Sequence, residues 1–546
     1  MAGNGTLNKE WLTFSWGVGG MSLLPKNVFL DCRRSAQSAA GRIRPIVAFF
    51  CFSLMVLASA RPVRANCENI PPGKSFWVRL LDPVASYSSK PGTFIRAVLI
   101  QSPDCDGAPV FPAGLEVDGQ VVAARKVGLG LLHETASLEI IFDRIITADG
   151  SVLPIASQVV EVDNARETVR KGKIRGILAT YTPQGRITDG LGHLPSLNPY
   201  SAPSLIVYRL FTVLPEPEIY LPPGTDLRLQ LNVPLYVGDQ PELPQVSFEM
   251  DEVERGDVEM LLQKNTARTY TRKGKEADLV NVLFLGSREQ MDTAFRAAGW
   301  MNGDRLSTRS VLREFRAFLT LSNYPTAPIT TQYLQGQRQD VTWQKSFNSY
   351  SRRDHVRLWE EPGTVLGQDA WLGTSSRETS AALSITQHKF IHHLDRNLDD
   401  GVNMLVRDLT LAGCVKSVQL LPRPELHETF VNATGDEMRT AGALTVVQLA
   451  DCSNSRTEYA RANPLIPVRP HSWLVRYLRT QVLLYKGDVV RGNLIYSGYY
   501  VGRIGIHALR FRHQHGQEED ADGLPFSPVS PDTLFPQITF AGGSGL

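Results

Sequence analysis

The sequence predicts a multidomain protein in which an N-terminal all-β domain, of barrel or sandwich type, precedes an α+β domain with a mixed sheet and packed helices. Its 546 residues exceed what one compact core normally holds. From residue 73 to about residue 235, short stretches of alternating apolar and polar residues are separated by Pro and Gly, as in antiparallel sheets. From residue 279 onward, strand-like runs alternate with segments of helical periodicity.

Composition and charge indicate a globular protein that does not bind nucleic acid. With 42% hydrophobic and 21% charged residues, the chain has the composition of ordinary globular protein. The net charge of +2 is uneven, because residues 1–65 hold eight Lys or Arg and two Asp or Glu, which leaves 49 against 53 in the remainder. Nucleic-acid affinity depends on clustered Lys and Arg that neutralise phosphates. We therefore expect no nucleic acid among the partners.

The N-terminal segment has the order of a secretory signal. Arg42 and Arg44 precede an apolar run over 46–60, and small residues follow. As a helix this run spans about 22 Å, less than the ~30 Å of a bilayer core, so we expect no stable transmembrane span after signal cleavage. Cleavage after Ala60 and cleavage after Ala65 both fit the pattern. We favour Ala65, which predicts a periplasmic or secreted protein.

Cysteine usage fits export to an oxidising compartment. Of the six cysteines, two lie in the leader and four remain: Cys67, Cys105, Cys414 and Cys452. They form no Cys-x-x-Cys pair, so we expect no zinc site. We also predict no other metal and no cofactor. Four cysteines allow three connectivities, and we predict the two local bridges, Cys67–Cys105 and Cys414–Cys452.

Strands of the first domain show clear alternation at 76–80 and at 138–142. Two segments that echo each other, 111–117 and 221–227, each place Pro and Gly before an alternating strand. Many short strands of even spacing indicate a closed barrel or a sandwich.

These turns also carry a resemblance to a known fold. Its motifs are Pro91-Gly92 before a strand, Phe111-Pro112-Ala113-Gly114 leading into 117–121, Asp149-Gly150, and a late strand over 221–235. In this pattern the region resembles the periplasmic β-barrel of TrbI-type conjugation scaffolds. The resemblance implies partners among envelope or secretion-system proteins.

Two segments interrupt the strand patterns. We interpret the apolar, Pro-containing stretch 190–211 as a loop with one partly buried helix. The charge-rich stretch 237–277 predicts a linker with one helix at its apolar part, 258–262.

The second domain opens with a buried strand over 279–285. Ser287 can cap the following helix together with Gln290, three residues further on. A second helix follows Ser307, with apolar residues on one face, and a third helix begins near Asp399. The apolar face of the second helix comprises Val311, Leu312, Phe315, Phe318 and Leu319. Further strands are predicted over 341–347, 355–359, 383–390, 415–421 and 444–449.

Several ordered motifs stand out in this domain. They are Asn281–Gly286, Gly299-Trp300, Tyr333–Asp340 with Arg338, Arg353–Trp359 with Arg357 and Trp359, Trp371-Leu372-Gly373, and Ile391–Asp399. Together they resemble the LssY C-terminal family over about residues 255–450. The family implies no particular reaction, although it also occurs joined to membrane phosphatase-like modules.

The chain departs from the family pattern at two places. Gly401-Val402 stands where the family usually has Glu-Arg, and Thr440-Ala441-Gly442 stands where it usually has Thr-Asp-Gly. Any activity that needs those charged groups is therefore in doubt here.

Four residues of these motifs are candidates for a reaction centre: His355, His392, Asp395 and Asp399. Two imidazoles and two carboxylates suit a divalent metal or an acid–base pair. Each residue also has a structural explanation. Asp399 stands where the third helix needs an N-cap, and Asp395 lies in a turn. His355 shares a strand face with Arg357 and Trp359. The spacing matches no established metal signature, and we favour the structural explanation.

The predicted domains are a leader (1–65), a TrbI-like β-rich domain (66–236), a linker (237–254), an LssY C-terminal-like domain (255–455), a β-rich extension (456–512) and a flexible tail (513–546). We predict an exported bacterial cell-envelope protein that serves as a non-enzymatic scaffold or interaction protein of envelope or secretion assemblies. The alternative is an exported metal-dependent hydrolase of a phosphate ester that uses the four candidate residues.

Overall fold

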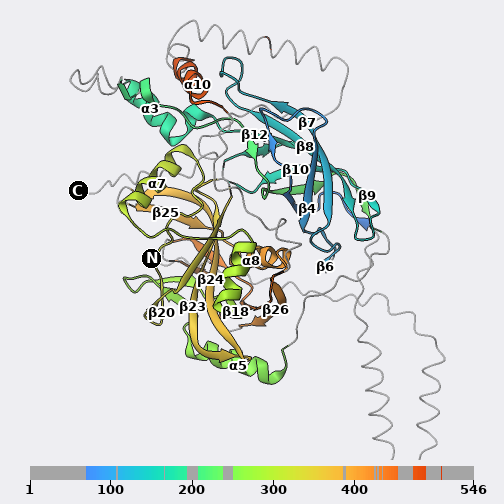
Figure 1. Ribbon diagram of the computed structural model, residues 1–546, viewed down its shortest axis with the longest axis vertical. Helices are drawn as coiled ribbons and strands as arrows, with labels where there is room; N and C mark the ends of the chain where they lie inside the picture. The colour runs from blue at the N-terminus through green and yellow to red at the C-terminus, as the bar shows by residue number, and fades with distance from the viewer. Residues whose placement is uncertain are drawn as a thin grey trace, which may run out of the picture. The chain divides into compact units, whose positions relative to one another are not determined.

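The computed structural model describes residues 69–105, 108–164, 166–193, 207–208, 210–237, 250–347, 349–384, 389–423, 426, 429–432, 435–452, 471–486 and 506. All of them belong to one unit, Cys67–Leu546, which is separate from Met1–Asn66. The predicted leader and the predicted tail, 513–546, lie outside the described residues. Two β-sheets make up most of the described chain (Figure 1).

The first sheet has nine antiparallel strands in the order β10-β14-β2-β4-β7-β8-β12-β11, with β9 paired to β8. Because β10 at one end of this order contacts β11 at the other, the sheet is a nearly closed barrel. The all-β first domain predicted from the turns is thus confirmed. Its strands are β2 (Ser75–Leu80), β4 (Phe94–Gln101), β7 (Glu116–Arg125), β8 (Ser137–Ile146), β9 (Val152–Pro154), β10 (Ser157–Val162), β11 (Thr168–Arg170), β12 (Lys173–Arg175) and β14 (Asp226–Leu231).

Alternating apolar residues fill the interior of this barrel. Val78 and Leu80 of β2 and Leu138 and Phe142 of β8 all belong to one core and are almost fully buried. Gly119 lies at a bulge in β7, where an added Cβ would be 2.3 Å from the carbonyl oxygen of Ile141. Three short pairs complete the domain: β1 (Asn69–Ile70) with β15 (Leu235–Tyr236), β3 (Val84–Ala85) with β13 (Tyr220–Leu221), and β5 (Asp104–Cys105) with β6 (Ala108–Pro109).

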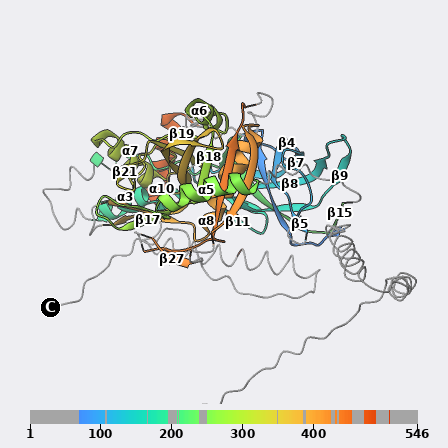
Figure 2. The same ribbon diagram turned by 90° about the horizontal axis from the view of Figure 1, so that it is seen from below.

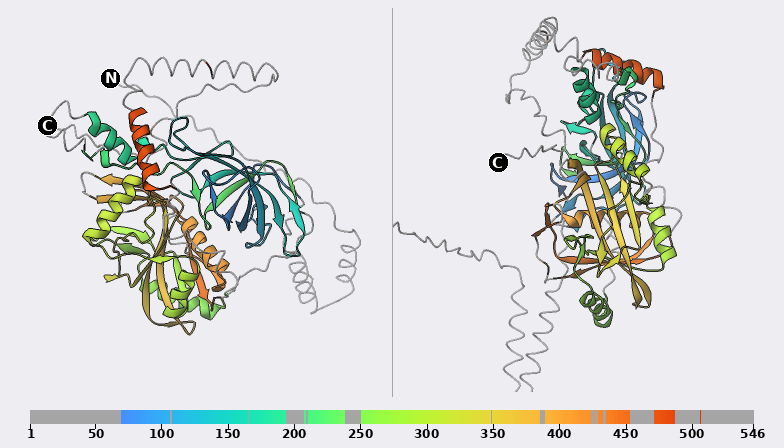
Figure 3. Two further views of the ribbon diagram at one scale, coloured as in Figure 1. Left: turned by 45° about the horizontal axis from the view of Figure 1, so that its top comes forward. Right: turned by 90° about the vertical axis from the view of Figure 1, so that its left-hand side faces the viewer.

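Two helices flank the barrel, α3 (Pro183–His193), which follows a short 3-10 helix (Ala179–Tyr181), and α10 (Trp473–Tyr485). In Figure 3, α10 is the red-orange helix beside α3. Leu483 and Leu484 of α10 pack against Ala179 and Leu214. The β-rich extension predicted over 456–512 is therefore wrong for residues 471–486, where apolar residues recur with helical spacing.

The second sheet is mixed, as predicted, with the order β19-β22-β23-β24-β18-β29-β26 and β25 paired to β24. Only β18 and β29 run parallel, and the other neighbours are antiparallel. Its strands are β18 (Val282–Leu285), β19 (Met301–Asn302), β22 (Val341–Ser346), β23 (Arg353–Val365), β24 (Gln368–Ser384), β25 (Lys389–Leu394), β26 (Val415–Pro422) and β29 (Ala443–Leu449).

Helices cover both faces of this sheet. On one face, Phe284 of β18 shares a core with Phe295 of α6 (Arg288–Ala297) and Leu405 of α8 (Leu398–Leu411). On the other face, Leu283 packs with Val258 of α5 (Glu252–Lys264). Figure 2 shows α5 running across the strands. Part of the predicted linker over 237–254 is thus the first turn of a helix, which a capping box between Asp251 and Glu254 starts.

Two helices begin at the capping residues that the sequence predicts, and a third begins at a different one. Ser287 and Gln290 form the predicted capping box of α6, and Ser307 caps α7 (Thr308–Thr320). The cap of α8 is Asn397, whose side chain accepts from the amide of Asp399 (3.3 Å). Because the helix already begins at Leu398, Asp399 lies inside its first turn and is not the predicted N-cap.

The strand predicted over 383–390 is also corrected. These residues span the end of β24 and the start of β25. The sequence pattern missed most of the 17-residue β24 because its centre, 374–378, is polar although buried. Smaller pairings involve β16 (Arg268–Tyr270), β17 (Glu276–Leu279), β20 (Tyr333–Leu334) and β21 (Gln337–Arg338), and separately β27 (Thr429–Val431) with β28 (Glu437–Arg439).

The predicted Cys414–Cys452 disulfide is present and joins the residue just before β26 to the residues after β29. Cys105 is also disulfide-bonded. Its predicted partner, Cys67, lies outside the described residues. Within the described ranges, no helix combines the length and the apolar character needed to cross a bilayer.

Candidate functional site

The two candidate histidines converge on a carboxylate that the sequence did not single out. Strands β23, β24 and β25 lie side by side, with His355 opposite Ser376 and His392 opposite Ala381. Glu378 of β24 lies between the histidines. Its Oε1 is 3.4 Å from Nδ1 of His355, and its Oε2 is 2.9 Å from Nδ1 of His392.

Further polar side chains surround this carboxylate. Arg353 approaches Glu378 with Nε at 2.5 Å and Nη2 at 3.2 Å. The Tyr350 hydroxyl lies 2.8 Å from Nε2 of His392 and donates to Glu314 of α7. We call this set the histidine cluster. It comprises Glu314, Tyr350, Arg353, His355, Ser376, Glu378 and His392.

The charges in the histidine cluster support one another. Burial opposes ionisation of Glu378, but Arg353 and then His392 hold the pKa of this carboxyl well below its usual range. Burial also opposes the charged form of His392, yet Glu378 raises the pKa of this imidazole above its usual value. For His355, burial and then Arg357 lower the pKa well below its usual value. The surroundings therefore favour the charged form of the His392 imidazole and the neutral form of the His355 imidazole.

One alignment in the histidine cluster has the order of a nucleophile and its base. Ser376 Oγ is 2.9 Å from Nε2 of His355, whose Nδ1 faces Glu378. However, Ser376 has no exposed surface, and the side chains of His355 and His392 are 3% and 13% exposed. A substrate in the surrounding solvent therefore does not reach the Ser376 hydroxyl in this conformation.

The candidate aspartates lie outside the histidine cluster. Asp395 accepts from the amide of Asn397 (3.1 Å), which is the turn role considered for it. Asp399 accepts from Thr440 Oγ1 (2.9 Å) and from the amide of Ala441 (2.8 Å). The structure thus brings His355 and His392 together but not the two aspartates with them. Among the residues that the structure describes, no three His, Cys, Asp or Glu side chains are arranged to hold a metal ion.

The departures from the family pattern fit this packing. A Cβ added to Gly401 of α8 would lie 3.2 Å from backbone atoms of Ser376 and Arg377, so a longer side chain would require a small shift of the helix from β24. At the second departure, the backbone amide of Ala441 and the hydroxyl of Thr440 make the contacts with Asp399.

The motif residues are mainly structural. Arg357 donates to Asp278 (2.6 Å), and Trp359 donates to the carbonyl of Gln337 (3.0 Å). Trp371, fully buried, donates to the carbonyl of Gly286 (3.1 Å). Arg338 is exposed on β21. These contacts give Arg357, Trp359 and Trp371 structural roles in the core of the domain and at its edges.

A second buried polar cluster joins the barrel to the α+β domain, and we call it the junction network. Arg79 of β2 contacts Asp226 of β14 (2.7 Å) and Asp408 of α8 (2.9 Å). Asp408 also contacts Lys345 of β22 (2.7 Å) and accepts from Trp300 Nε1 (3.0 Å). All four charged side chains are at most 1% exposed.

The junction network continues at the end of β10. Asp163 lies 2.8 Å from Arg352 Nε and 3.0 Å from Arg377 Nη2, and Arg377 also pairs with Asp354 (2.9 Å). Burial raises the pKa of Asp354 to about 6, against the opposing effect of Arg377. The full junction network comprises Arg79, Asp163, Asp226, Lys345, Arg352, Asp354, Arg377 and Asp408.

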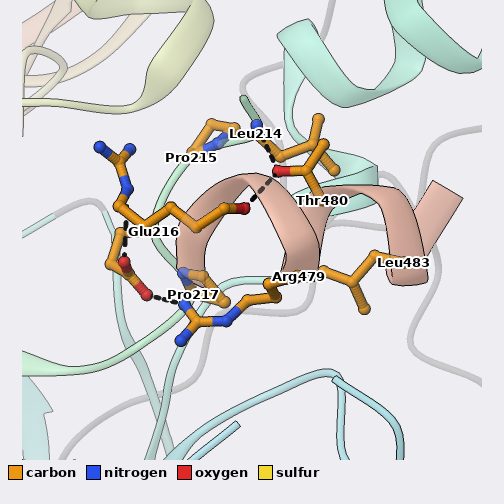
Figure 4. Close-up of a pocket in the computed structure, with 8 residues that line it drawn as sticks. Leu214, Pro215, Glu216, Pro217, Arg479, Thr480 and Leu483 are labelled. Atoms are coloured by element: carbon orange, nitrogen blue, oxygen red, sulfur yellow. Dashed lines mark hydrogen bonds and ion pairs between the residues drawn. The ribbon is translucent and has the colours of Figure 1, made fainter. Parts of the chain in front are cut away.

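A small hollow beside α10 is lined by the protein's own ion pairs. Figure 4 shows Glu216 and Arg479 pointing toward each other, and Thr480 accepting from the amide of Leu214 (3.0 Å). Arg476 Nε lies 3.5 Å from Glu216. The charged groups of this hollow are therefore matched within the protein.

Sequence reasoning missed Glu378, Tyr350 and Glu314. One signal was available for Glu378, because it alternates with Ser376 and Thr374 in a polar run directly after the Trp371-Leu372-Gly373 motif. For Tyr350 and Glu314, which come from a loop and from α7, no local pattern in the sequence indicates the contact.

Comparisons with known proteins agree with part of this picture. Residues 259–444 match the family described as LssY C-terminus, which confirms the resemblance of that domain. No curated protein matches the chain. A solved structure that resembles the chain is ComB10 of the Com type IV secretion system of Helicobacter pylori, at 14% identity, covering 32% of this chain and 93% of that chain with a TM-score of 0.18. A likeness at this level carries no argument about function.

Proposed function

We propose that this chain is an exported cell-envelope protein that acts as a non-enzymatic scaffold, with its barrel and its LssY C-terminal domain joined as one platform for partners of an envelope or secretion assembly. One observation carries the proposal: the charged groups of the histidine cluster are paired with one another inside the protein. Glu378 balances Arg353 and His392, and His355 faces Glu378 and Ser376. Side chains held in this way stabilise a fold and leave no charged group directed at a ligand.

Two further features support the proposal. The junction network links two sheets through buried ion pairs, which suits a platform whose domains keep a fixed relation. The Cys414–Cys452 disulfide suits an oxidising compartment, which is where the predicted signal would direct the chain.

Fractionation of cells that produce the full chain tests the proposal. We expect the protein in the periplasm or the medium, with an N-terminus near Asn66 by mass spectrometry. The purified protein should hydrolyse no phosphate monoester or diester substrate above background. An intact N-terminus in the cytoplasm would contradict export, and phosphoesterase activity that disappears in His392→Ala would contradict the scaffold.

An exported hydrolase is the second candidate, because Ser376, His355 and Glu378 have the order of a catalytic triad. A serine-reactive phosphonate probe separates the candidates. Labelling of Ser376 would favour the hydrolase, and absence of labelling under native conditions, with labelling of an esterase control, would favour the scaffold.

A further inference from the structure

Helix α7 has three exposed apolar side chains. Of the apolar face predicted from the sequence, Phe318 is buried, whereas Leu312 is 67% exposed, Val311 44% and Phe315 39%. The side that packs against the domain carries Ser310 and Ala317 together with Phe318. Helix α7 is labelled in Figures 1 and 2.

Basic side chains accompany this apolar stripe. Arg309, Arg313 and Arg316 are exposed along the helix, and Arg305 precedes it. Among the described residues, Arg313 faces Asp304 at 3.7 Å, and the other three have no carboxylate within ion-pair distance.

The single acidic residue of α7 does not offset these charges on the outside. Glu314 accepts from the hydroxyl of Tyr350 and lies 3.8 Å from Nε2 of His392, so it belongs to the histidine cluster. The face of α7 that meets solvent is therefore apolar and positively charged.

We propose that α7 binds the surface of a bilayer that contains anionic phospholipid. Leu312 and Val311 would enter the boundary between headgroups and acyl chains, and Arg309 and Arg316 would face the lipid phosphates. A helix of 13 residues is about 20 Å long, so it lies along the surface and does not cross the bilayer.

Charge favours a membrane over a second copy of the chain. Two α7 helices laid stripe to stripe would bring their arginines together without matching acidic groups, and like charges at short range repel. An anionic bilayer offers apolar depth and negative charge side by side. The inference rests on the proposed function, because an exported envelope protein meets such a surface.

Hydrogen exchange of the full chain with phosphatidylglycerol–phosphatidylcholine vesicles tests the inference. Peptides covering 305–321 should gain protection with these vesicles and not with pure phosphatidylcholine. Reading protection at α7 itself separates its binding from any contribution of the predicted signal segment. Arg309→Gln with Arg316→Gln should weaken α7 protection about 30-fold in lipid concentration, and Leu312→Ser about tenfold.

Matched variants remove the same groups elsewhere. Arg272→Gln with Lys273→Gln takes two exposed positive charges from the β16–β17 turn, and Leu420→Ser removes a leucine that is 62% exposed on β26. Both should keep the protection of the parent. Equal protection by neutral vesicles, or loss in the control variants as large as in the α7 variants, would overturn the assignment. The assignment would also be overturned if the protein formed a dimer that Leu312→Ser dissociates and α7 bound no vesicles.

The two proposals fail separately. A protein whose α7 is protected by anionic vesicles but which stays in the cytoplasm would contradict the proposed function and leave the helix assignment intact. An exported protein whose α7 gains no protection from anionic vesicles would contradict the helix assignment and leave the proposed function intact.

Discussion

The junction network and the histidine cluster are both buried and polar, but they balance charge in different ways. In the junction network, Arg79 and Lys345 meet Asp226 and Asp408 as direct ion pairs. In the histidine cluster, one carboxylate, Glu378, serves an arginine and two imidazoles. Stability that depends on the Arg79 ion pairs should change little near neutral pH, whereas the histidine cluster contains imidazoles that titrate there.

The largest expected effect is that of Asp408→Ala. The substitution leaves Arg79 and Lys345 buried without a shared carboxylate and removes the acceptor of Trp300. We expect a loss of about 3–5 kcal/mol in the free energy of unfolding by urea. The matched control is Asp82→Ala, at the exposed pair with Arg96, which should cost less than about 1 kcal/mol. If Asp408→Ala and Asp82→Ala reduced the free energy of unfolding equally, the junction network would not be a major source of stability.

A smaller loss is expected from Glu378→Gln. The amide can still accept hydrogen bonds, and Arg353 keeps its contact with Gln344 Oε1 (3.2 Å), so we expect about 2–3 kcal/mol. Urea unfolding at pH 7 measures it. A loss greater than that of Asp408→Ala would reverse the ranking of the two clusters.

The two histidines should change the pH dependence of stability in opposite directions. The raised pKa of His392 contributes stability that is fully present below about pH 6.5 and is lost as the pH rises through the folded value. The lowered pKa of His355 contributes stability that is present above about pH 6.5 and is lost as the pH falls. Relative to the parent, His392→Gln should therefore gain stability with rising pH, and His355→Gln should lose it.

Urea unfolding between pH 5.5 and 8 measures these slopes, each of at most about 1.4 kcal/mol per pH unit. Asp354, whose pKa is raised to about 6, lowers stability as the pH rises toward and just past 6, at the acidic end of that range, in all three proteins. The difference between the two variants therefore isolates the histidines. Parallel profiles for the two variants would contradict the assignment of one charged and one neutral imidazole.

The smallest effects concern the start of α8. Asn397→Ala removes the cap and should cost about 1 kcal/mol in thermal or urea unfolding, while Asn397→Asp should stay near the parent. Asp399→Ala should cost a similar amount through the bonds from Thr440 and Ala441. If Asn397→Ala has no effect, the assignment of Asn397 as the cap of α8 would be contradicted.

Local signals in the sequence predicted the local parts of the fold. The boxes at Ser287 and Ser307 depend on residues three positions apart. Of the strand predicted over 279–285, the part that forms β18 (Val282–Leu285) is apolar on both faces because helices cover both, whereas Leu279 ends β17. The Cys414–Cys452 bridge joins neighbouring strands of one sheet. In these cases the interacting residues are close in sequence, or the sequence shows a recognisable hydrophobic or cysteine pattern.

Features set by distant contacts could not be predicted in the same way. The apolar stripe of α7 shows a helix but not which face will pack, and the domain selects the face with Ser310 and Ala317. Arg79 and Asp226 are 147 positions apart, so no window of sequence indicates their pairing. For the candidate site, the pattern singled out both histidines but not Glu378, because a buried polar strand has no apolar alternation.

The most direct test of the central claim, that the histidine cluster holds the fold together, is the thermal melt of the parent and His392→Ala with and without chelator. We predict that His392→Ala melts at a lower temperature than the parent, because Glu378 loses one of its partners and Tyr350 loses a hydrogen bond. Chelator should shift neither protein. A melting temperature that falls with chelator in the parent, but not in His392→Ala, would contradict the claim and identify a bound metal.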